Sequence, residues 1–225
     1  MTRTTPLPAR HAYRLWAPRY DDETAVSALE DRVVGGLAPD LTGRALLDAA
    51  CGTGRRLPAG SGPARAVGVD LVPEMLARAR AAGRSRSLVA ADLRALPFGD
   101  ARFDVIWCRL ALGHLREIGP AYVEFARVSR ADAHLVVSDF HADAVAAGHT
   151  RTFRDTDGRV RTVEHHLHQA GDHVRAAAAW GWRLERELEA PAGEPERPFY
   201  ERAGRLSQFD RERSLPLILV MRFRR

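Results

Sequence analysis

Apolar runs that stop abruptly at polar or glycine-rich positions recur along the first 140 residues. The runs at 46–49 and 66–69, and those within 87–98 and 103–115, are nearly continuous, as in strands buried on both faces of a parallel sheet. The segment 23–37 has apolar residues at helical spacing instead. Strands alternating with helices predict an α/β fold.

The second half continues this alternation and then departs from it. The pattern predicts a helix at 120–130, a fifth strand at 133–140, a helix at 172–180, a sixth strand at 182–188, a short helix at 199–206 and a final strand at 215–223. Between the fifth strand and the next helix, two extended runs flank Asp155-Thr156-Asp157-Gly158, a turn sequence with glycine where positive φ is wanted. We therefore predict a β-hairpin inserted after the fifth strand.

Glycines and acids follow the predicted strands. The stretch LLDAACGTGR, residues 46–55, ends a strand in Gly52-Thr53-Gly54, where the backbone can approach a ligand closely. Asp70 ends the second strand, and Asp92 follows the third. A glycine-rich first turn with an acid after the next strand is the arrangement that binds an adenosine ribose. Without a ligand, the same acids serve as helix N-caps.

Four motifs in order, DxxCGTG, GVDxxPEML, ADLxxLPF and FDVIxCxxALxHL, carry a resemblance to the class I S-adenosylmethionine-dependent methyltransferase family. The resemblance extends from about Tyr13 to Phe140. It implies an α/β, Rossmann-like class I methyltransferase fold: a seven-stranded, mostly parallel sheet whose last strand is antiparallel. To this fold the chain adds the predicted lid or hairpin insert after strand five. The chain departs from the pattern at Ala50, where many members have glycine, and the segment 56–63 favours only a short, poor helix.

The resemblance also implies the roles of individual residues toward S-adenosylmethionine and its product S-adenosylhomocysteine. Asp70 would accept the ribose hydroxyls, Asp92 and Leu93 would bind the adenine, and Asp48 would orient the turn. The remaining expected cofactor residues are Tyr20, Ala50, Gly52, Gly54, Leu71 and Arg109.

The candidate catalytic residues are histidines. His114 follows the fourth strand, His141 follows the fifth, and alternation in the insert would place Glu164, His166 and His168 on one face. Such residues can act as a general base or orient a substrate. Strand residues two apart allow a metal pair without requiring one, so we expect no metal. The alternative for each histidine is a structural or solvent-facing position.

We expect a single methyltransferase domain over residues 1–225. Residues 1–37 would form an N-terminal cap and 141–170 a substrate lid. No apolar run reaches the length of a membrane span, and 1–10 lacks the apolar centre of a signal peptide. Cys51 and Cys108 are expected to be buried thiols, and we expect a cytoplasmic protein.

The chain carries a formal charge of +5 but contains no lysine and no asparagine, a bias typical of GC-rich genomes. Its arginines are scattered and form no aromatic-interleaved basic patch, which argues against a nucleic-acid partner. The oligomeric state, monomer or homodimer, stays open.

The sequence therefore predicts a methyltransferase acting on a small molecule, in the setting of bacterial secondary metabolism. Three alternatives remain. A methyltransferase-fold protein can bind the cofactor and catalyse a non-methylating reaction such as cyclisation. An RNA methyltransferase would show salt-dependent RNA binding. A nicotinamide-dependent oxidoreductase should show GxGxxG, whereas Leu57 stands at the third glycine position.

Overall fold

The computed structural model describes residues 5–58, 62–84 and 87–225. Parts of two predicted segments, 1–4 of the cap and 59–61 of the poor helix, lie outside them. The strands are β1 Ala45–Ala49, β2 Arg65–Asp70, β3 Leu88–Ala90, β4 Phe103–Arg109, β5 Ser129–Phe140, β6 Thr152–Arg154, β7 Val160–Thr162, β8 Arg183–Ala190 and β9 Ile218–Arg224. The helices are α1 Ala9–Trp16, α2 Ala25–Leu37, α3 Pro73–Ala81, α4 Gly119–Val128, α5 Ala142–Ala146, α6 Ala170–Ala178, α7 Arg197–Arg202 and α8 Leu206–Glu212, with the 3₁₀ turns η1 Ala17–Arg19 and η2 Leu112–His114.

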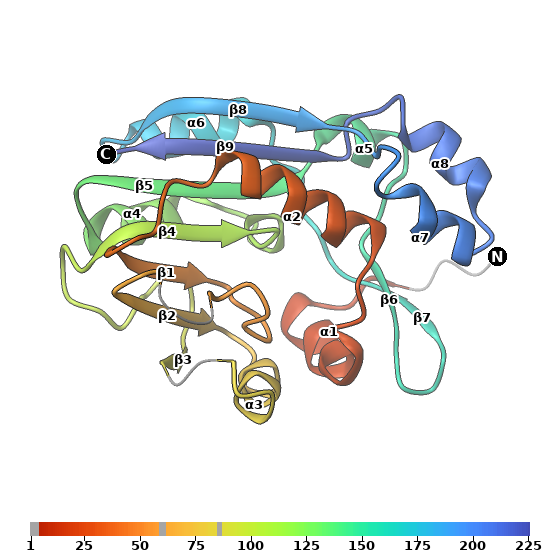
Figure 1. Ribbon diagram of the computed structural model, residues 1–225, viewed down its shortest axis with the longest axis horizontal. Coiled ribbons are helices and arrows are strands. Elements are labelled where there is room, and N and C mark those ends of the chain that lie inside the picture. Colours follow the sequence, from red (N-terminus) through yellow and green to blue (C-terminus); the bar gives the residue numbers. More distant parts are fainter. Residues whose placement is uncertain (1–4, 59–61, 85–86) are drawn as a thin grey trace.

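The main sheet has seven strands in the order β3-β2-β1-β4-β5-β9-β8. Strands β1 to β5 are mutually parallel, and β9 runs antiparallel between β5 and β8. This confirms the predicted sheet with its antiparallel last strand. The carboxyl ends of the parallel strands all point to one edge, where α1 and the β6–β7 hairpin lie (Figure 1).

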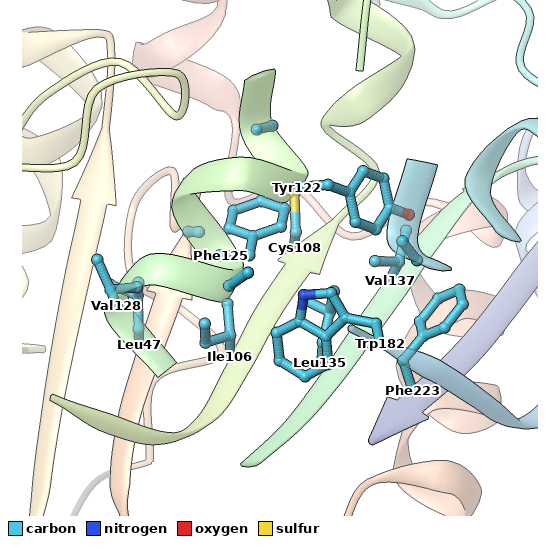
Figure 2. Packing of buried hydrophobic residues seen from close by; sticks show 14 of the residues in the cluster. Leu47, Ile106, Cys108, Tyr122, Phe125, Val128, Leu135, Val137, Trp182 and Phe223 are labelled. Atoms are coloured by element: carbon cyan, nitrogen blue, oxygen red, sulfur yellow. The ribbon is translucent and has the colours of Figure 1, made fainter. Parts of the chain in front are cut away.

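Helices cover both faces of this sheet. On one face, Tyr122 and Phe125 of α4 pack against Ile106, Leu135 and Phe223 of the central strands (Figure 2). On the other face, α2 packs with α7 and α8 residues over β5 and β9. Of the predicted N-terminal cap, α1 and η1 thus lie beyond the strand ends, while α2 belongs to the sheet layers (Figure 1).

Several predicted boundaries were wrong. The α2 helix begins at Ala25, two residues after the predicted start, and ends at Leu37 as predicted. In the described part of the β1–β2 connection, 50–58 and 62–64, the backbone forms turns and no helix. The predicted helix at 199–206 is divided into α7 and α8, and α5 was not foreseen.

The predicted hairpin exists. Strands β6 and β7 pair antiparallel around a turn in which Gly158 has φ of 80°. The extended alternation does not continue, because β7 ends at Thr162 and residues 164–169 form no strand. Whether the hairpin acts as a substrate lid stays a prediction.

Nothing in the described residues could serve as a membrane-spanning helix, since none is both long and apolar enough.

Candidate functional site

Two cavities meet at the carboxyl ends of the parallel strands. The smaller, of about 100 Å³, lies over the ends of β1, β2 and β4. The larger, of about 630 Å³, extends from there toward α5, α7 and α8. Tyr13, Tyr20 and Leu110 line both cavities, so these residues mark their junction.

The small cavity gathers residues that are distant in sequence. Eight of the ten expected cofactor residues line it: Tyr20, Ala50, Gly52, Asp70, Leu71, Asp92, Leu93 and Arg109. They meet because parallel strands bring their carboxyl ends to one edge, where ligands of such sheets bind. The other two, Asp48 and Gly54, are not among the described residues that line it. Asp48 is 2% exposed, and burial raises its pKa to about 6.

Asp70 links the glycine turn to the second strand. One carboxylate oxygen accepts a hydrogen bond from the Gly52 N–H, and the other accepts one from the Val72 N–H, both at 2.8 Å. Burial raises the pKa of Asp70. A carboxylate has about four lone-pair positions, so two remain for a ligand's hydroxyl groups. The carboxylate therefore both shapes the turn and can bind a diol.

The glycine turn itself requires unusual backbone angles. Gly52 has φ of 58°, and a Cβ there would lie 3.2 Å from Tyr20 Cε1. Ala50 has φ of 73°, in the left-handed region that L-residues seldom adopt. Alanine at position 50, where many members of the family have glycine, is therefore a source of backbone strain.

The part of the small cavity lined by Asp92 and Leu71 is polar at one point and apolar at another. Arg94 donates to both Asp92 oxygens, at 3.0 and 2.6 Å, and these hydrogen bonds lower the pKa of Asp92. Leu71 is 45% exposed, unusual for a large apolar side chain at a strand end. An exposed leucine beside a carboxylate suits a flat ring with a polar edge.

A buried ionic cluster stands behind the small cavity. Arg109, which lines the cavity, donates from Nε and Nη2 to the two oxygens of Glu30 at 2.8 and 2.6 Å. Its Nη2 also contacts Asp31 at 2.5 Å, and Arg56 reaches both acids, at 3.0 and 2.5 Å. Glu30 is fully buried, and Ser138 donates to it. Each guanidinium here faces carboxylates, so the cluster is close to neutral.

Tyr13, His114 and Arg151 form a second polar cluster at the junction. His114 Nδ1 lies 3.1 Å from the Glu164 carbonyl, which can only accept, so Nδ1 carries the proton. Its Nε2 is then an acceptor, 2.9 Å from Tyr13 Oη and 3.0 Å from Arg151 Nη1. Burial, together with the nearby Arg151 charge, lowers the pKa of His114 to about 3. The imidazole is therefore neutral at physiological pH.

The histidine-rich segment 164–168 fastens the insert to η2. The His166 N–H donates to the Gly113 carbonyl at 2.7 Å, and His168 Nε2 donates to the Leu115 carbonyl at 2.8 Å. His165 Nε2 lies 3.3 Å from Asp139 Oδ1. We call these contacts the histidine clasp. Its contacts hold the insert against the turn that carries His114.

The other predicted histidines have partners away from both cavities. Among the described lining residues, neither His141, His166 nor His168 appears. His141 accepts from the Asp143 N–H at the start of α5, and its Nε2 lies 3.0 Å from Glu189. Their catalytic role stays a prediction that none of these contacts supports. No group of three potential ligands in the described residues is placed to hold a metal ion.

Comparison with known proteins finds similarity to methyltransferases in the region that contains the small cavity. A family profile described as a methyltransferase domain matches residues 47–137, which contain the end of β1, the glycine turn, strands β2 to β4 and most of β5. Over these residues the chain resembles the class I S-adenosylmethionine-dependent methyltransferases. The match covers the small cavity's strand ends and ends before the hairpin.

Individual relatives with methyltransferase names are similar to the chain. A malonyl-[acyl-carrier protein] O-methyltransferase from Dechloromonas aromatica is 32% identical over 76% of the chain, which spans 62% of that relative. The chain spans about half the length of other relatives with the same name. A 27-O-demethylrifamycin SV methyltransferase from Amycolatopsis mediterranei is 27% identical over 99% of the chain and 90% of its own length.

A solved structure shows the same fold. The S-adenosylmethionine-dependent methyltransferase from Mesorhizobium loti superposes with a TM-score of 0.69 at 24% identity. The alignment covers 89% of this chain and all of that protein.

Sequence reasoning missed the ionic cluster and Arg151. One signal was present for the cluster: Glu30 stands four residues after Val26 and three before Val33, on the apolar face of α2. A charge on that face indicates a buried partner. Arg151 carried no such signal, because its burial depends on contacts with α1, the β4 end and β5.

Proposed function

We propose that the chain is an S-adenosylmethionine-dependent methyltransferase that methylates a small-molecule acceptor in bacterial secondary metabolism. The observation that carries the proposal is the small cavity, in which eight residues expected from the family pattern come together at the strand ends. The rifamycin methyltransferase, similar along 99% of the chain, supports the metabolic setting.

The residues of the small cavity fit the cofactor. Asp70 would bind the ribose hydroxyls with its two unused lone-pair positions, and Leu71 would cover the adenine. Asp92 and the Leu93 N–H would bind the adenine edge, and Arg109 would face the methionine end. The cofactor supplies the methyl group. We infer that the acceptor occupies the large cavity and meets the methyl group at Tyr13, Tyr20 and Leu110.

The outer wall of the small cavity would have to move for binding. Its volume of about 100 Å³ is below the several hundred Å³ of typical small-molecule sites. That wall consists of Ala9, Arg10 and Tyr13 of α1, a short helix with only Ala12 buried. We propose that α1 shifts outward to admit the cofactor and returns to exclude water.

Catalysis would then rest mainly on alignment and water exclusion. A methyl transfer needs little covalent help from the protein, and a held geometry accounts for much of such accelerations. Tyr13, Leu110 and His114 line the place where the two substrates meet. We propose His114 as an orienting group whose Nε2 accepts a hydrogen bond there.

Calorimetry with S-adenosylhomocysteine tests the cofactor site. We expect Asp70→Asn to weaken binding roughly tenfold or more, because an amide replaces a charged acceptor of two hydroxyl groups. Asp210→Asn, an exposed change on α8, is the matched control and should bind as the parent does. Equal affinities in a folded Asp70→Asn protein would contradict the assignment.

Two further measurements separate the alternatives. Transfer of an isotope-labelled methyl group to a product distinguishes methylation from cyclisation. Stabilisation against heating by S-adenosylhomocysteine but not by NAD excludes the oxidoreductase, because only a ligand of the folded state raises the midpoint. Steeply salt-dependent RNA binding would instead favour an RNA substrate.

A further inference from the structure

Arg151 is a buried cation with only neutral partners. It is 8% exposed, and its Nη1 donates to the Leu110 carbonyl at 2.8 Å and to Tyr13 Oη at 2.5 Å. Its Nη2 is buried without a hydrogen-bond partner, and in the described part of the chain no carboxylate lies within ion-pair distance of it. Burying a guanidinium without a neighbouring anion lowers the stability of the fold, because the charge loses its hydration.

The nearest groups that could neutralise this cation do not do so. Burial raises the pKa of Tyr13 to about 12, so its hydroxyl stays protonated. His114 is neutral, as its hydrogen bonds show. The charge of the buried acid Asp139 acts on Arg151, but the two form no ion pair among the described residues. Asp139 Oδ1 is bonded to His165 and to the Phe140 N–H, whereas its Oδ2 is buried without a hydrogen-bond partner.

The unpaired cation faces the place where an acceptor would bind. Arg151 lines the large cavity, beside Leu110 and Tyr13 at the junction. The Phe140 ring lies under its guanidinium, 4.8 Å from Cζ to the ring centroid, and holds it in place. Arg55, which lines the same cavity, also has a buried Nε without a partner, and its nearest carboxylate oxygen is 3.9 Å away.

We propose that the counter-ion missing from Arg151 is the acceptor itself, a small carboxylic acid whose ionised carboxyl group is the methylated position. This inference rests on the proposed function. A planar carboxylate matches the donor fork of a guanidinium and forms a charge-assisted pair with it. Binding would neutralise Arg151 and place a carboxylate oxygen at the junction with the small cavity.

The chemistry of a carboxylate acceptor suits the groups that are present. A carboxylate oxygen forms the new O–C bond while the bond from methyl carbon to sulfur breaks, and that electron pair stays on sulfur. The negative acceptor and positive donor become a neutral ester and a neutral thioether, with no proton to remove. A phenol or alcohol would need a base, whereas His114 Nε2 is engaged by Tyr13 and Arg151.

Binding of acetate and acetamide provides a test that requires no knowledge of the full acceptor. Both probes are titrated at constant ionic strength into protein saturated with S-adenosylhomocysteine, and the thermal midpoint is followed. We expect acetate to raise the midpoint and acetamide to leave it unchanged. Arg151→Met should require at least about tenfold more acetate for the same rise. Arg159→Met, an exposed arginine of the hairpin, should respond as the parent does.

Arg151→Lys keeps the positive charge but lacks the planar guanidinium with its paired donors. It replaces Arg151→Met in the test if the methionine variant fails to fold. We expect an acetate response intermediate between the parent and no response. Equal responses to acetate and acetamide in the parent, or an undiminished acetate response in both Arg151 variants, would overturn the inference. Loss of S-adenosylhomocysteine binding in Arg151→Met would show the cofactor's own carboxylate to be the counter-ion, which also overturns it.

Failure of the proposed function would look different, because the parent protein would then not bind S-adenosylhomocysteine at all. A second readout uses labelled methyl transfer to a panel of small carboxylic acids and phenols. Methyl esters release methanol in mild base, whereas aryl ethers do not. We expect base-labile product. Base-stable product from phenols would contradict a carboxylate acceptor.

Discussion

The two polar clusters of the site differ in whether carboxylates neutralise their arginines. Behind the small cavity, Arg109 and Arg56 face Glu30 and Asp31 at hydrogen-bond distance. At the junction, Arg151 has a phenol, an imidazole and a carbonyl as neighbours. The arginines of both clusters are largely buried, so the difference between them lies mainly in charge balance.

The difference in charge balance indicates that one cluster has a structural role and the other a role in ligand binding. A compensated cluster is complete within the chain, and it fixes Arg109 relative to α2 whether or not a ligand is bound. An uncompensated cation gains most from a ligand that supplies the absent charge. If the proposed sites are correct, the cofactor side is rigid structure, and the acceptor side is a position whose charge balance is completed by binding.

The largest effect is expected from breaking the compensated cluster. Glu30→Gln leaves Arg109 and Arg56 without their shared buried anion, and we expect a loss of about 3 kcal/mol or more of unfolding free energy. Asp31→Asn removes a half-exposed anion and should cost clearly less. Urea unfolding measures both. Equal losses would mean that burial of Glu30 does not set its role.

The second effect concerns His114, whose folded-state pKa of about 3 lies below its ordinary value of 6.5. Below pH 6.5 the unfolded chain binds a proton that the folded chain excludes, so stability is present above that pH and falls as pH decreases toward 3. The loss attributable to one histidine is up to about 1.4 kcal/mol per pH unit. His114→Gln should reduce this slope, while His11→Gln, an exposed change, should keep it. Unfolding curves recorded between pH 7 and 5 measure the slope of stability against pH for the parent and both variants.

The third effect comes from loosening the histidine clasp. A Cβ on Gly113 would overlap His165 Nε2 and lie 2.9 Å from Asp139 Oδ1, so Gly113→Ala must displace the clasp. We expect a loss of about 1–3 kcal/mol, typical of overpacking. Gly119→Ala, where a Cβ meets nothing within 4 Å, is the control. Thermal unfolding measures both variants. Unchanged midpoints would show that the histidine clasp can be displaced without loss of stability.

The smallest effect is a gain on the cofactor side. Ala50→Gly relieves a positive φ, and we expect about 1 kcal/mol of added stability. Ala178→Gly, at the end of α6, should change stability in the opposite direction because glycine weakens a helix. Chemical denaturation of the two variants shows whether each change raises or lowers the unfolding free energy. Destabilisation by Ala50→Gly would indicate that chain entropy outweighs the strain.

The cofactor side could be predicted from sequence because its residues follow strands. Gly52, Asp70 and Asp92 each stand just after an apolar run, and parallel pairing brings such positions together without further information. The antiparallel last strand, β9, was expected only from the resemblance to the family.

The acceptor side could not be predicted in the same way. Period-two alternation assigned faces to His166 and His168, but β7 ends at Thr162, and the later residues are placed by hydrogen bonds to η2. Arg151 lies where α1, β5 and the end of β4 converge, a contact that no local pattern records. Tertiary packing, and not periodicity, decides these positions.

The aromatic stack between α1 and the hairpin has an optical consequence. Trp16 lies 5.1 Å from Phe153 between ring centroids, nearly parallel to it, and borders the large cavity. The other three tryptophans, Trp107, Trp180 and Trp182, are not among the described residues lining either cavity. Excited-state emission from Trp16 thus reports on the junction of α1 and the hairpin. With the other three indoles replaced by phenylalanine, the protein would carry its own fluorescent gauge of acceptor occupancy.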